Sequence, residues 1–355
     1  MNIKLSLNWQ VSQSEPLNVD PILFVLLTTI QRLGSLKRAT DDIKISYRFA
    51  WGLLLKWEQF LGQPLVILER GRGAYLSPIG EKLLNANVQL LAHFTPELEN
   101  FATQFKQDFE SLLDKGKTAY LNIYASHGLA ISTLRDLINQ QSNFKLDLHF
   151  HGSLESLKAL ENGRCDIAGF HVPIGPLAKN IRTQYLKLID PHKYTLLYVV
   201  KRNQGLMFKP KNADKITAIS SLTNADLRFI NRQKDSGTRL LFDQLLDADS
   251  INPNNIKGYN HEEFTHMAVA AMIASDAADV GFGIAPMANK FNLEFVPLIW
   301  EHYCLAIPNH LGESESTKQI TELLGSAAFR NNLSGYPGYD ASHSGNSVTF
   351  KEIFS

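Results

Sequence analysis

The stretch KISYRFAWGLLLKWEQFLG, residues 44–62, predicts a helix that begins after Ser46 and ends at Gly62. Serine is a favoured residue before a helix, and glycine is a favoured residue after one. The apolar residues recur at helical spacing, and we expect this stripe to be buried: Phe49, Ala50, Leu53, Leu54 and Trp57. The other face carries Tyr47, Arg48, Trp51, Lys56 and Gln59. A basic and aromatic outer face indicates a function besides packing.

Two shorter helical patterns precede this stretch. Asp20 is the predicted cap of the first, Pro21 is its first residue, and the helix is expected to end at Gly34. Ser35 is the predicted cap of a second helix over residues 36–43. Because a tight turn joins it to the helix after Ser46, the order is typical of a helix-turn-helix.

The residues after Gly62 predict a β-hairpin followed by a long helix. The segment PLVILERGRGAYLSPIGEKLL, residues 64–84, alternates as two strands around Arg70 and Arg72 and enters a helix at Ser77. A hairpin with basic residues at its tip is a wing that can contact phosphates or a minor groove. Residues 20–85 hold nine Lys and Arg against six Asp and Glu, a net charge of +3 in a chain with 35 of each sign.

Residues 34–84 resemble the winged helix-turn-helix of LysR-type regulators, and ISYRFAW, residues 45–51, is similar to the corresponding segment of molybdate-responsive repressors. The resemblance implies binding of double-stranded DNA. The expected DNA-binding residues are Ser35, Lys37, Arg38, Ser46, Tyr47, Arg48, Trp51, Arg70 and Arg72. Two alternatives stay open: the charges form only a solvated helix face, or Trp51 packs with Leu55 on a neighbouring helix or subunit.

The long helix carries its own apolar stripe. Residues 77–114 are helical in pattern, with Pro96 able to kink them, and the stripe consists of Leu83, Leu84, Val88, Leu91 and Phe94. In LysR-type proteins the corresponding helix pairs two subunits, so the resemblance implies a homodimer or a homotetramer. The alternative is that the stripe packs on its own wing domain. A polar linker, residues 114–118, follows.

From residue 118 the pattern becomes one of alternating strands and helices, which predicts an α/β domain with a mostly parallel sheet. Strands are expected at residues 293–298 and 302–308, and a late helix at 318–333. The predicted domains are a winged helix-turn-helix at 1–85, a linker and dimerisation helix at 86–117 and a two-lobed domain at 118–355. The lobes are expected at about 118–197 plus 299–355, and at 198–298.

Hydroxyl-bearing residues stand where predicted strands end and helices begin. Ser126 and Ser153 follow two strands, and Ser236, Gly237 and Thr238 open another helix. Backbone N–H groups and hydroxyls at helix starts bind anions, and the nearby cations are Arg232, Lys234 and Arg239. The plainer alternative is that these serines only cap helices.

Residues 120–355 resemble the periplasmic-binding-protein-like (type II) domains found behind such wings and attached to some molybdopterin-biosynthesis proteins. The resemblance rests on GSLESLKALENGRCDIAGFHVP, INRQKDSGTRLLFDQLL, GYNHEEFTHMAVAAMIASDAADVGFGIAP, FVPLIWEHYCLAIP and LSGYPGYD. DSGTR, residues 235–239, is similar to a phosphate- and tungstate-type binding loop. The expected ligand-binding residues are Ser126, His127, Ser153, His171, Ser236, Gly237, Thr238, Arg239, Thr265 and His266, with Gly281 on the opposing wall.

Other classes of function find little support in the sequence. The two cysteines make no disulfide framework, and no apolar stretch is long enough for a membrane span, so we expect a cytoplasmic protein without a membrane partner. The histidines lack the spacing of a metal motif. Asp166 with His171, or Glu262 with His266, are weak candidates for catalysis, so no enzyme, no cofactor and no metal are expected.

The sequence therefore predicts a DNA-binding transcriptional regulator whose C-terminal domain senses a small anion, either a molybdate- or tungstate-type oxyanion or an organic acid. The alternative is a non-regulatory ligand-binding protein or a molybdenum-cofactor-related assembly protein.

Overall fold

The computed structural model describes residues 3–12, 16–69, 73–113, 120–141, 144–234 and 236–354. The chain divides into two compact units, one formed by Ser6–Ala92 and the other by His93–Ser355 with Met1–Leu5. No helix in these described ranges has the length and apolarity needed to cross a membrane. The predicted boundaries at residues 85 and 117, and the predicted lobe limits, stay predictions.

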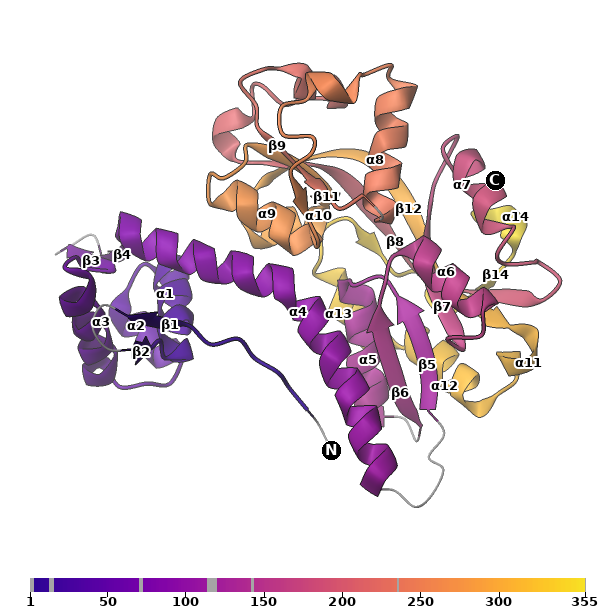
Figure 1. Ribbon diagram of the computed structural model, residues 1–355, viewed down its shortest axis with the longest axis horizontal. Helices are drawn as coiled ribbons and strands as arrows, with labels where there is room; N and C mark the ends of the chain where they lie inside the picture. Colours follow the sequence, from indigo (N-terminus) through magenta and orange to yellow (C-terminus); the bar gives the residue numbers. More distant parts are fainter. Residues whose placement is uncertain are drawn as a thin grey trace. The chain divides into compact units, whose positions relative to one another are not determined.

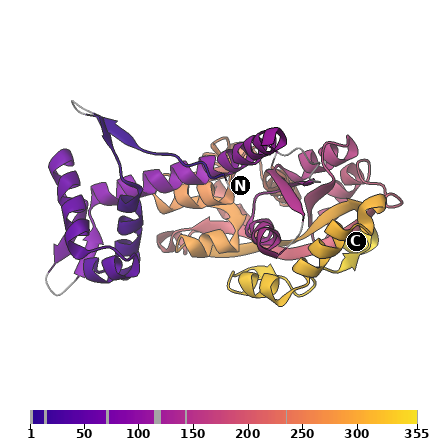
Figure 2. The same cartoon turned by 90° about the horizontal axis from the view of Figure 1, so that it is seen from below.

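The first unit consists of helices packed together with short hairpins (Figure 2). Its elements are β1 (Gln10–Ser12), β2 (Pro16–Asn18), α1 (Pro21–Leu33), α2 (Leu36–Asp42), α3 (Tyr47–Leu61), β3 (Val66–Glu69), β4 (Gly73–Leu76) and the start of α4 (Pro78–Leu113). The predicted caps are confirmed, because Asp20, Ser35 and Ser46 each accept a hydrogen bond from a backbone N–H in the first turn of their helix. The hairpin β1–β2 is not anticipated by the sequence reasoning.

The turn between α2 and α3 contains Lys44 at a position where many such turns have a glycine. Lys44 adopts a φ of 58°, the left-handed conformation that glycine usually supplies. In α3 the predicted stripe is confirmed at Ala50, Leu53, Leu54 and Trp57, which are buried. The prediction for Phe49 is wrong, since this side chain is 48% exposed. Phe49 lies one residue, about 100° of helical rotation, from Ala50 and so falls outside the narrower buried stripe.

Helix α4 runs without interruption through Pro96. The predicted apolar stripe divides along it. Leu84 is buried in the core of the first unit, and Leu83 and Val88 pack against that core. Leu91 and Phe94 remain exposed. The alternative that the stripe packs on its own domain thus holds for its first half.

The second unit is built on one mixed sheet in the order β10-β9-β11-β8-β12-β7-β5-β6. Its strands are β5 (Tyr120–Ala125), β6 (Lys145–Phe150), β7 (Ile167–Pro173), β8 (Tyr194–Phe208), β9 (Phe229–Arg232), β10 (Glu262–Glu263), β11 (Val280–Ile284) and β12 (Glu294–Pro308), with β13 (Tyr339–Asp340) and β14 (Ser347–Val348) beside β8. Strands β5 to β7 and β9 to β11 pair in parallel, but the long β8 and β12 are antiparallel to each other and to their neighbours. The prediction of a mostly parallel sheet is therefore wrong at its centre.

The predicted strands at 293–298 and 302–308 are one strand, β12, with register shifts along it. Strands β8 and β12 span the sheet's two halves, which we call the first lobe (β5–β7 and their helices) and the second lobe (β9–β11 and theirs). The late helix predicted at 318–333 is two helices, because Ser326 starts a new one after Gly325.

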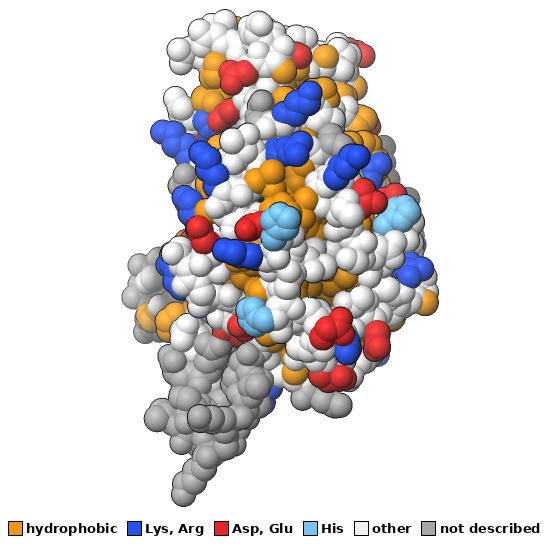
Figure 3. All heavy atoms as spheres, turned by 90° about the vertical axis from the view of Figure 1, so that its right-hand side faces the viewer, with side chains coloured by type: hydrophobic (Ala, Val, Ile, Leu, Met, Phe, Trp, Pro, Cys, Tyr) orange, Lys and Arg blue, Asp and Glu red, His pale blue; other side chains and the backbone are white. Residues whose placement is uncertain are grey.

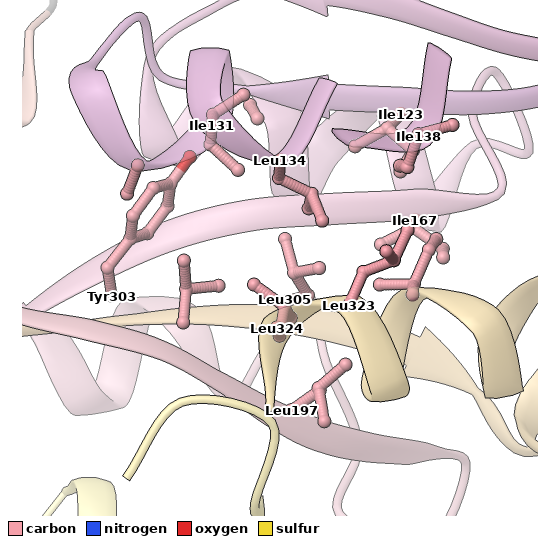
Figure 4. Packing of buried hydrophobic residues seen from close by; sticks show 14 of the residues in the cluster. Ile123, Ile131, Leu134, Ile138, Ile167, Leu197, Tyr303, Leu305, Leu323 and Leu324 are labelled. Carbon is pink, nitrogen blue, oxygen red and sulfur yellow. The ribbon is translucent and has the colours of Figure 1, made fainter. Parts of the chain in front are cut away.

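Helices cover both faces of each lobe (Figure 1). They are α5 (Leu129–Gln141), α6 (Ser153–Glu161), α7 (Ala178–Tyr185), α8 (Gly237–Ala248), α9 (His266–Ala274), α10 (Ala285–Lys290), α11 (Asn309–Gly312), α12 (Glu315–Leu324), α13 (Ala327–Ser334) and α14 (Phe350–Ile353). Figure 4 shows one core of the first lobe, where Ile131 and Leu134 of α5 face Leu305 of β12 and Leu324 of α12. Separate buried clusters on the two faces of each lobe fix the strand ends that carry the cavity described below.

Candidate functional site

The outer face of α3 is solvent-exposed as the sequence predicts. Tyr47 and Trp51 are 44% and 46% exposed and stack on each other, with ring centroids 6.4 Å apart. Arg48 is exposed beside them and makes no ion pair or side-chain hydrogen bond with the residues that the structure describes. The α3 face, by which we mean Tyr47, Arg48, Trp51 and Lys56, is therefore available to a partner.

The other predicted DNA-binding residues have local partners or are not described. Ser35 and Ser46 cap α2 and α3. Lys37 forms an exposed ion pair with Asp41 at 2.7 Å, and Arg38 donates to the carbonyl of Leu33. Arg70 and Arg72 lie outside the described residues.

A cavity of about 370 Å³ lies within the second unit. It is formed where strand ends of both lobes meet the first residues of α5, α6, α8 and α9. Helix starts present unpaired N–H groups and a partial positive charge, both of which favour an anion. The volume falls within the range of small-molecule sites, roughly 300–1,000 Å³.

Most of the predicted ligand-binding residues line this cavity. They are Ser126, His127, His171, Ser236, Gly237, Thr238, Thr265 and His266. Ser153 is buried just behind the wall, where its Oγ accepts a hydrogen bond of 3.1 Å from the backbone N–H of His171. Gly281 is enclosed in the second lobe's core and does not line the cavity. Asp235 lies outside the described residues.

The starts of α6 and α8 come close together across the cavity. A Cβ atom added to Gly237 would lie 3.6 Å from the Oγ of Ser153. Ser153 belongs to the first lobe and Gly237 to the second, so the two lobes approach each other at these helix starts. A small residue at Gly237 permits this approach.

Arg239 lies outside the cavity. It is buried, and its Nε lies 3.0 Å from Oδ1 of Asp243 while its Nη1 lies 3.1 Å from Oε1 of Glu262. The guanidinium also stacks over Tyr259, with its Cζ 4.1 Å from the ring centroid. Asp243 is four residues along the same helix, the spacing at which side chains meet. Arg239 therefore anchors α8 to its surroundings.

Arg202 and Glu301 line the cavity and were missed by the sequence reasoning. They lie opposite each other on β8 and β12, and the Nε of Arg202 donates to Oε1 of Glu301. Burial acts to lower the pKa of Arg202, but the neighbouring carboxylate of Glu301 raises it above the usual value. The only sequence signal for this pair is a charged residue inside each apolar strand.

Arg232, the last residue of β9, is a cation without a carboxylate partner. Its Nε donates to Oε1 of Gln233 at 3.1 Å and its Nη2 donates to the carbonyl of Phe264 at 2.9 Å. Both acceptors are neutral, and no described carboxylate forms an ion pair with it. Burial, followed by repulsion from Arg202, lowers the pKa of Arg232 to about 9, and the carboxylate of Glu263 acts in the opposite direction. Arg232 is thus a cavity cation whose hydrogen bonds go to neutral oxygens.

Three histidines of the cavity, His127, His171 and His266, are neutral near pH 7. Burial lowers the pKa of His127 to about 4, and it lowers the pKa values of His171 and His266 well below 6.5, with Arg202 and Arg232 adding to the shifts. Nε2 of His171 and Nδ1 of His266 are buried, and each lacks a hydrogen-bond partner among the described residues. Each ring can therefore supply one hydrogen bond to a ligand.

Helix α4 forms one side of the cavity through His93, Pro96, Glu97 and Asn100. It contacts the second lobe through His93, whose Nδ1 lies 3.2 Å from Oε2 of Glu263. It contacts the first lobe through Asn100, which accepts a hydrogen bond of 2.7 Å from the N–H of Phe150 and donates one of 3.2 Å to the carbonyl. The same helix wall thus touches both lobes.

The candidate catalytic pairs are engaged elsewhere. Oδ2 of Asp166 accepts a hydrogen bond of 2.8 Å from the N–H of Asn122, and Glu262 is paired with Arg239. Across the described residues no group of three or more His, Cys, Asp or Glu side chains is arranged to hold a metal ion.

The family model described as the PBP superfamily domain matches residues 134–325, more than half of the chain. The chain belongs to the PBP superfamily. The match covers most of the two lobes, but it begins after β5 and after the cavity residues Ser126, His127 and Leu129, and it does not include the first unit.

Two curated relatives resemble part of the chain. The uncharacterized protein YvgK of Bacillus subtilis is 32% identical over 197 residues, which are 55% of this chain and 63% of that protein. A Clostridium pasteurianum protein, described as uncharacterized and encoded in the 5′ region of a ferredoxin 2Fe-2S gene, is 34% identical over 111 residues, 31% of this chain and 98% of that protein. The match with YvgK thus spans less than two thirds of that relative.

Some solved structures align with this chain at low sequence identity. A Corynebacterium glutamicum OxyR mutant with bound H2O2 is 15% identical, with 88% of this chain and 93% of that chain covered and a TM-score of 0.45. An ABC-type phosphate transport receptor from Vibrio cholerae is 14% identical, with 61% and 98% covered and a TM-score of 0.46. Neither likeness bears on the function of this chain.

Acidification should destabilise the protein through His127. Between pH 6.5 and about 4 the unfolded chain binds a proton at this imidazole and the folded chain does not. The free energy of unfolding therefore decreases as the pH is lowered through this range. We expect His127→Asn to remove about 1–3 kcal/mol of this loss. Urea unfolding at pH 7.5 and pH 5 measures it. His261→Asn, at an exposed histidine outside the cavity, is the control, and an equal pH dependence in both variants would contradict the assignment.

Proposed function

We propose that the protein is a DNA-binding transcriptional regulator whose second unit senses a small anion. The observation that carries the DNA-binding half is the α3 face, which follows a tight turn and precedes the hairpin β3–β4 in one compact unit. This order is that of a winged helix-turn-helix, in which the second helix of the pair enters the major groove. Arg48 is exposed and free to bond a guanine edge.

The ligand-sensing half of the proposal is supported by Arg232. A half-buried cation whose hydrogen bonds go only to neutral oxygens is stabilised when an anion joins it. The starts of four helices surround the same cavity and favour the same sign of ligand charge. Membership of the PBP superfamily fits a domain that binds a small ligand.

Helix α4 is the element that could couple ligand binding to DNA binding under this proposal. It begins in the unit that carries the α3 face, and its later residues form a wall of the cavity. A ligand that shifts the lobes would act on His93 and Asn100, because each is bonded to a different lobe. Coupling between DNA and ligand requires such an element with two arrangements.

The second candidate is a non-regulatory ligand-binding or molybdenum-cofactor-related assembly protein. The superfamily match covers only the ligand-binding part, so it is compatible with both functions. The face of the molecule in Figure 3 does not include α3, and on it basic and acidic side chains are mixed with apolar ones. Binding of DNA through α3 separates the two candidates.

Arg48→Ala should weaken binding to a DNA fragment that the full-length protein selects from a random library. We expect a loss of about 1–3 kcal/mol, because a bidentate contact to a base edge is lost. Fluorescence anisotropy at fixed salt measures the affinity. Arg182→Ala, at an exposed arginine of the second unit, should leave it unchanged. Equal affinities for the parent and Arg48→Ala would remove α3 as the recognition helix.

The second half of α4 is expected to form a homodimer, with a homotetramer as the larger assembly. Phe101, Phe105 and Phe109 recur every four residues and are 64%, 46% and 38% exposed. Phe101→Glu with Phe105→Glu should raise the dissociation constant of the dimer at least about 100-fold, because two charges replace an apolar contact. Sedimentation velocity measures the assembly, with Tyr336→Glu as an exposed aromatic control. A double variant as dimeric as the parent would place the interface elsewhere.

A further inference from the structure

We propose that the cavity binds an organic monoanion, with a carboxylate-type head at Arg232 and an apolar body against the apolar part of the cavity lining. This inference rests on the proposed ligand-sensing role of the second unit and decides between the two ligand classes that the sequence leaves open. The apolar wall, as we call it, consists of Leu129, Met267, Ile284 and Met287. A bare oxyanion such as molybdate or tungstate has no group to place against it.

The size of the cavity favours an organic ligand. About 370 Å³ corresponds to roughly a dozen water molecules at about 30 Å³ each. A tetrahedral oxyanion has five heavy atoms and would leave most of this space to water. Water left inside would screen the attraction between the anion and Arg232. A ligand of ten or so heavy atoms fills the cavity and excludes that water.

The composition of the wall supports the same class. Leu129, at the start of α5, packs against a core of the second lobe that includes Ile284 and Met287. The apolar wall therefore continues a buried core and belongs to both lobes. Apolar side chains contribute to binding by removing apolar ligand surface from water, which a hydrated oxyanion does not offer.

The charges on the wall favour a single negative charge. Arg202 is neutralised by Glu301, with which it forms a buried ion pair. Glu97, Glu155 and Lys290 also line the cavity, and their side chains are exposed. The remaining cation is the half-buried Arg232, whose hydrogen bonds go to the neutral oxygens of Gln233 and Phe264. One such cation matches a single carboxylate, whereas a doubly charged oxyanion would retain an unpaired negative charge in the site.

Two unpartnered histidine nitrogens indicate that the ligand carries a further polar atom. Nε2 of His171 and Nδ1 of His266 belong to rings that line the cavity and are more than nine-tenths buried. The hydroxyls of Ser153 and Thr238 lie 3.4 Å from the other nitrogen of each ring and hold the rings in place. A buried polar nitrogen without a partner is costly, so a ligand hydroxyl or carbonyl is the expected complement.

The test is isothermal titration of the full chain without DNA. The organic probes are phenylacetate and hexanoate, the inorganic probes are molybdate, tungstate, sulfate and phosphate, and phenylacetamide is the uncharged match to phenylacetate. We expect at least one organic anion to bind with a dissociation constant of about 1 mM or below. Every inorganic anion and phenylacetamide should bind at least about tenfold more weakly.

Variants test separately the contact of Arg232 with the carboxylate and the contact of the apolar wall with the rest of the ligand. Arg232→Met should abolish binding of the organic anions, whereas Arg228→Met, at a surface arginine paired with Asp279, should retain it. Leu129→Gln should weaken hexanoate at least about fivefold, with Leu240→Gln, at an exposed leucine of α8, as the control. Circular dichroism checks that each variant is folded.

Two results would overturn the inference. One is tighter binding of molybdate, tungstate or another inorganic anion, which would leave the proposed anion sensor intact and change only its ligand. The other is the absence of binding by both organic anions up to about 10 mM. Because the titration contains no DNA, a failure of the proposed DNA binding cannot produce either result.

Discussion

The proposed binding of an anion by the second unit depends on the positive charge of Arg232, which lines the cavity and donates its hydrogen bonds to neutral oxygens. Its hydrogen bonds to Gln233 and Phe264 hold the guanidinium in place but do not neutralise it. The lowered pKa, about 9, reflects the free-energy cost of keeping the charge there. The helix starts around the cavity carry a partial positive charge, which adds to the cost of the Arg232 charge when the cavity is empty. A bound anion is attracted by both and removes this cost. A fold that retains such an arrangement is suited to binding an anion.

The position of Arg232 follows from the packing of the lobes. It ends β9, a short strand whose Phe229 and Ile230 are buried on opposite faces of the second lobe. The long strands β8 and β12 join that lobe to the first and carry the neutralised pair of Arg202 and Glu301. Helix α4 then covers one side of the cavity and continues into the first unit. Under the proposed function, these connections couple ligand binding to the arrangement of α4.

Local sequence signals predicted the parts of the site that depend on helix starts. Ser236 was found because a hydroxyl before a helix is a strong pattern, and it caps α8. Thr265, which caps α9, was expected only from the family resemblance. Arg239 was expected in the cavity since it follows Ser236, but Asp243 and Glu262 hold it outside. Sequence does not show which of several nearby carboxylates a flexible arginine will reach.

The pair of Arg202 and Glu301 was missed for a different reason. The two residues are 99 positions apart and meet only because β8 and β12 pair antiparallel in one register. The sequence reasoning divided β12 into two strands, so no partner for β8 could be assigned. Cross-strand pairing depends on the whole sheet, whereas helix caps depend on four or five adjacent residues. The same limit explains why the sheet was expected to be mostly parallel.

The central claim is that Arg232 binds an anion and does not stabilise the fold. The most direct test is the free energy of unfolding of ligand-free Arg232→Met, measured by urea denaturation at pH 7.5 after dialysis to remove bound small molecules. Removing a partly buried charge that makes no ion pair with a described carboxylate should raise the free energy of unfolding by about 1–3 kcal/mol relative to the parent. A decrease of similar size would show that Arg232 stabilises the fold, and it would contradict the account.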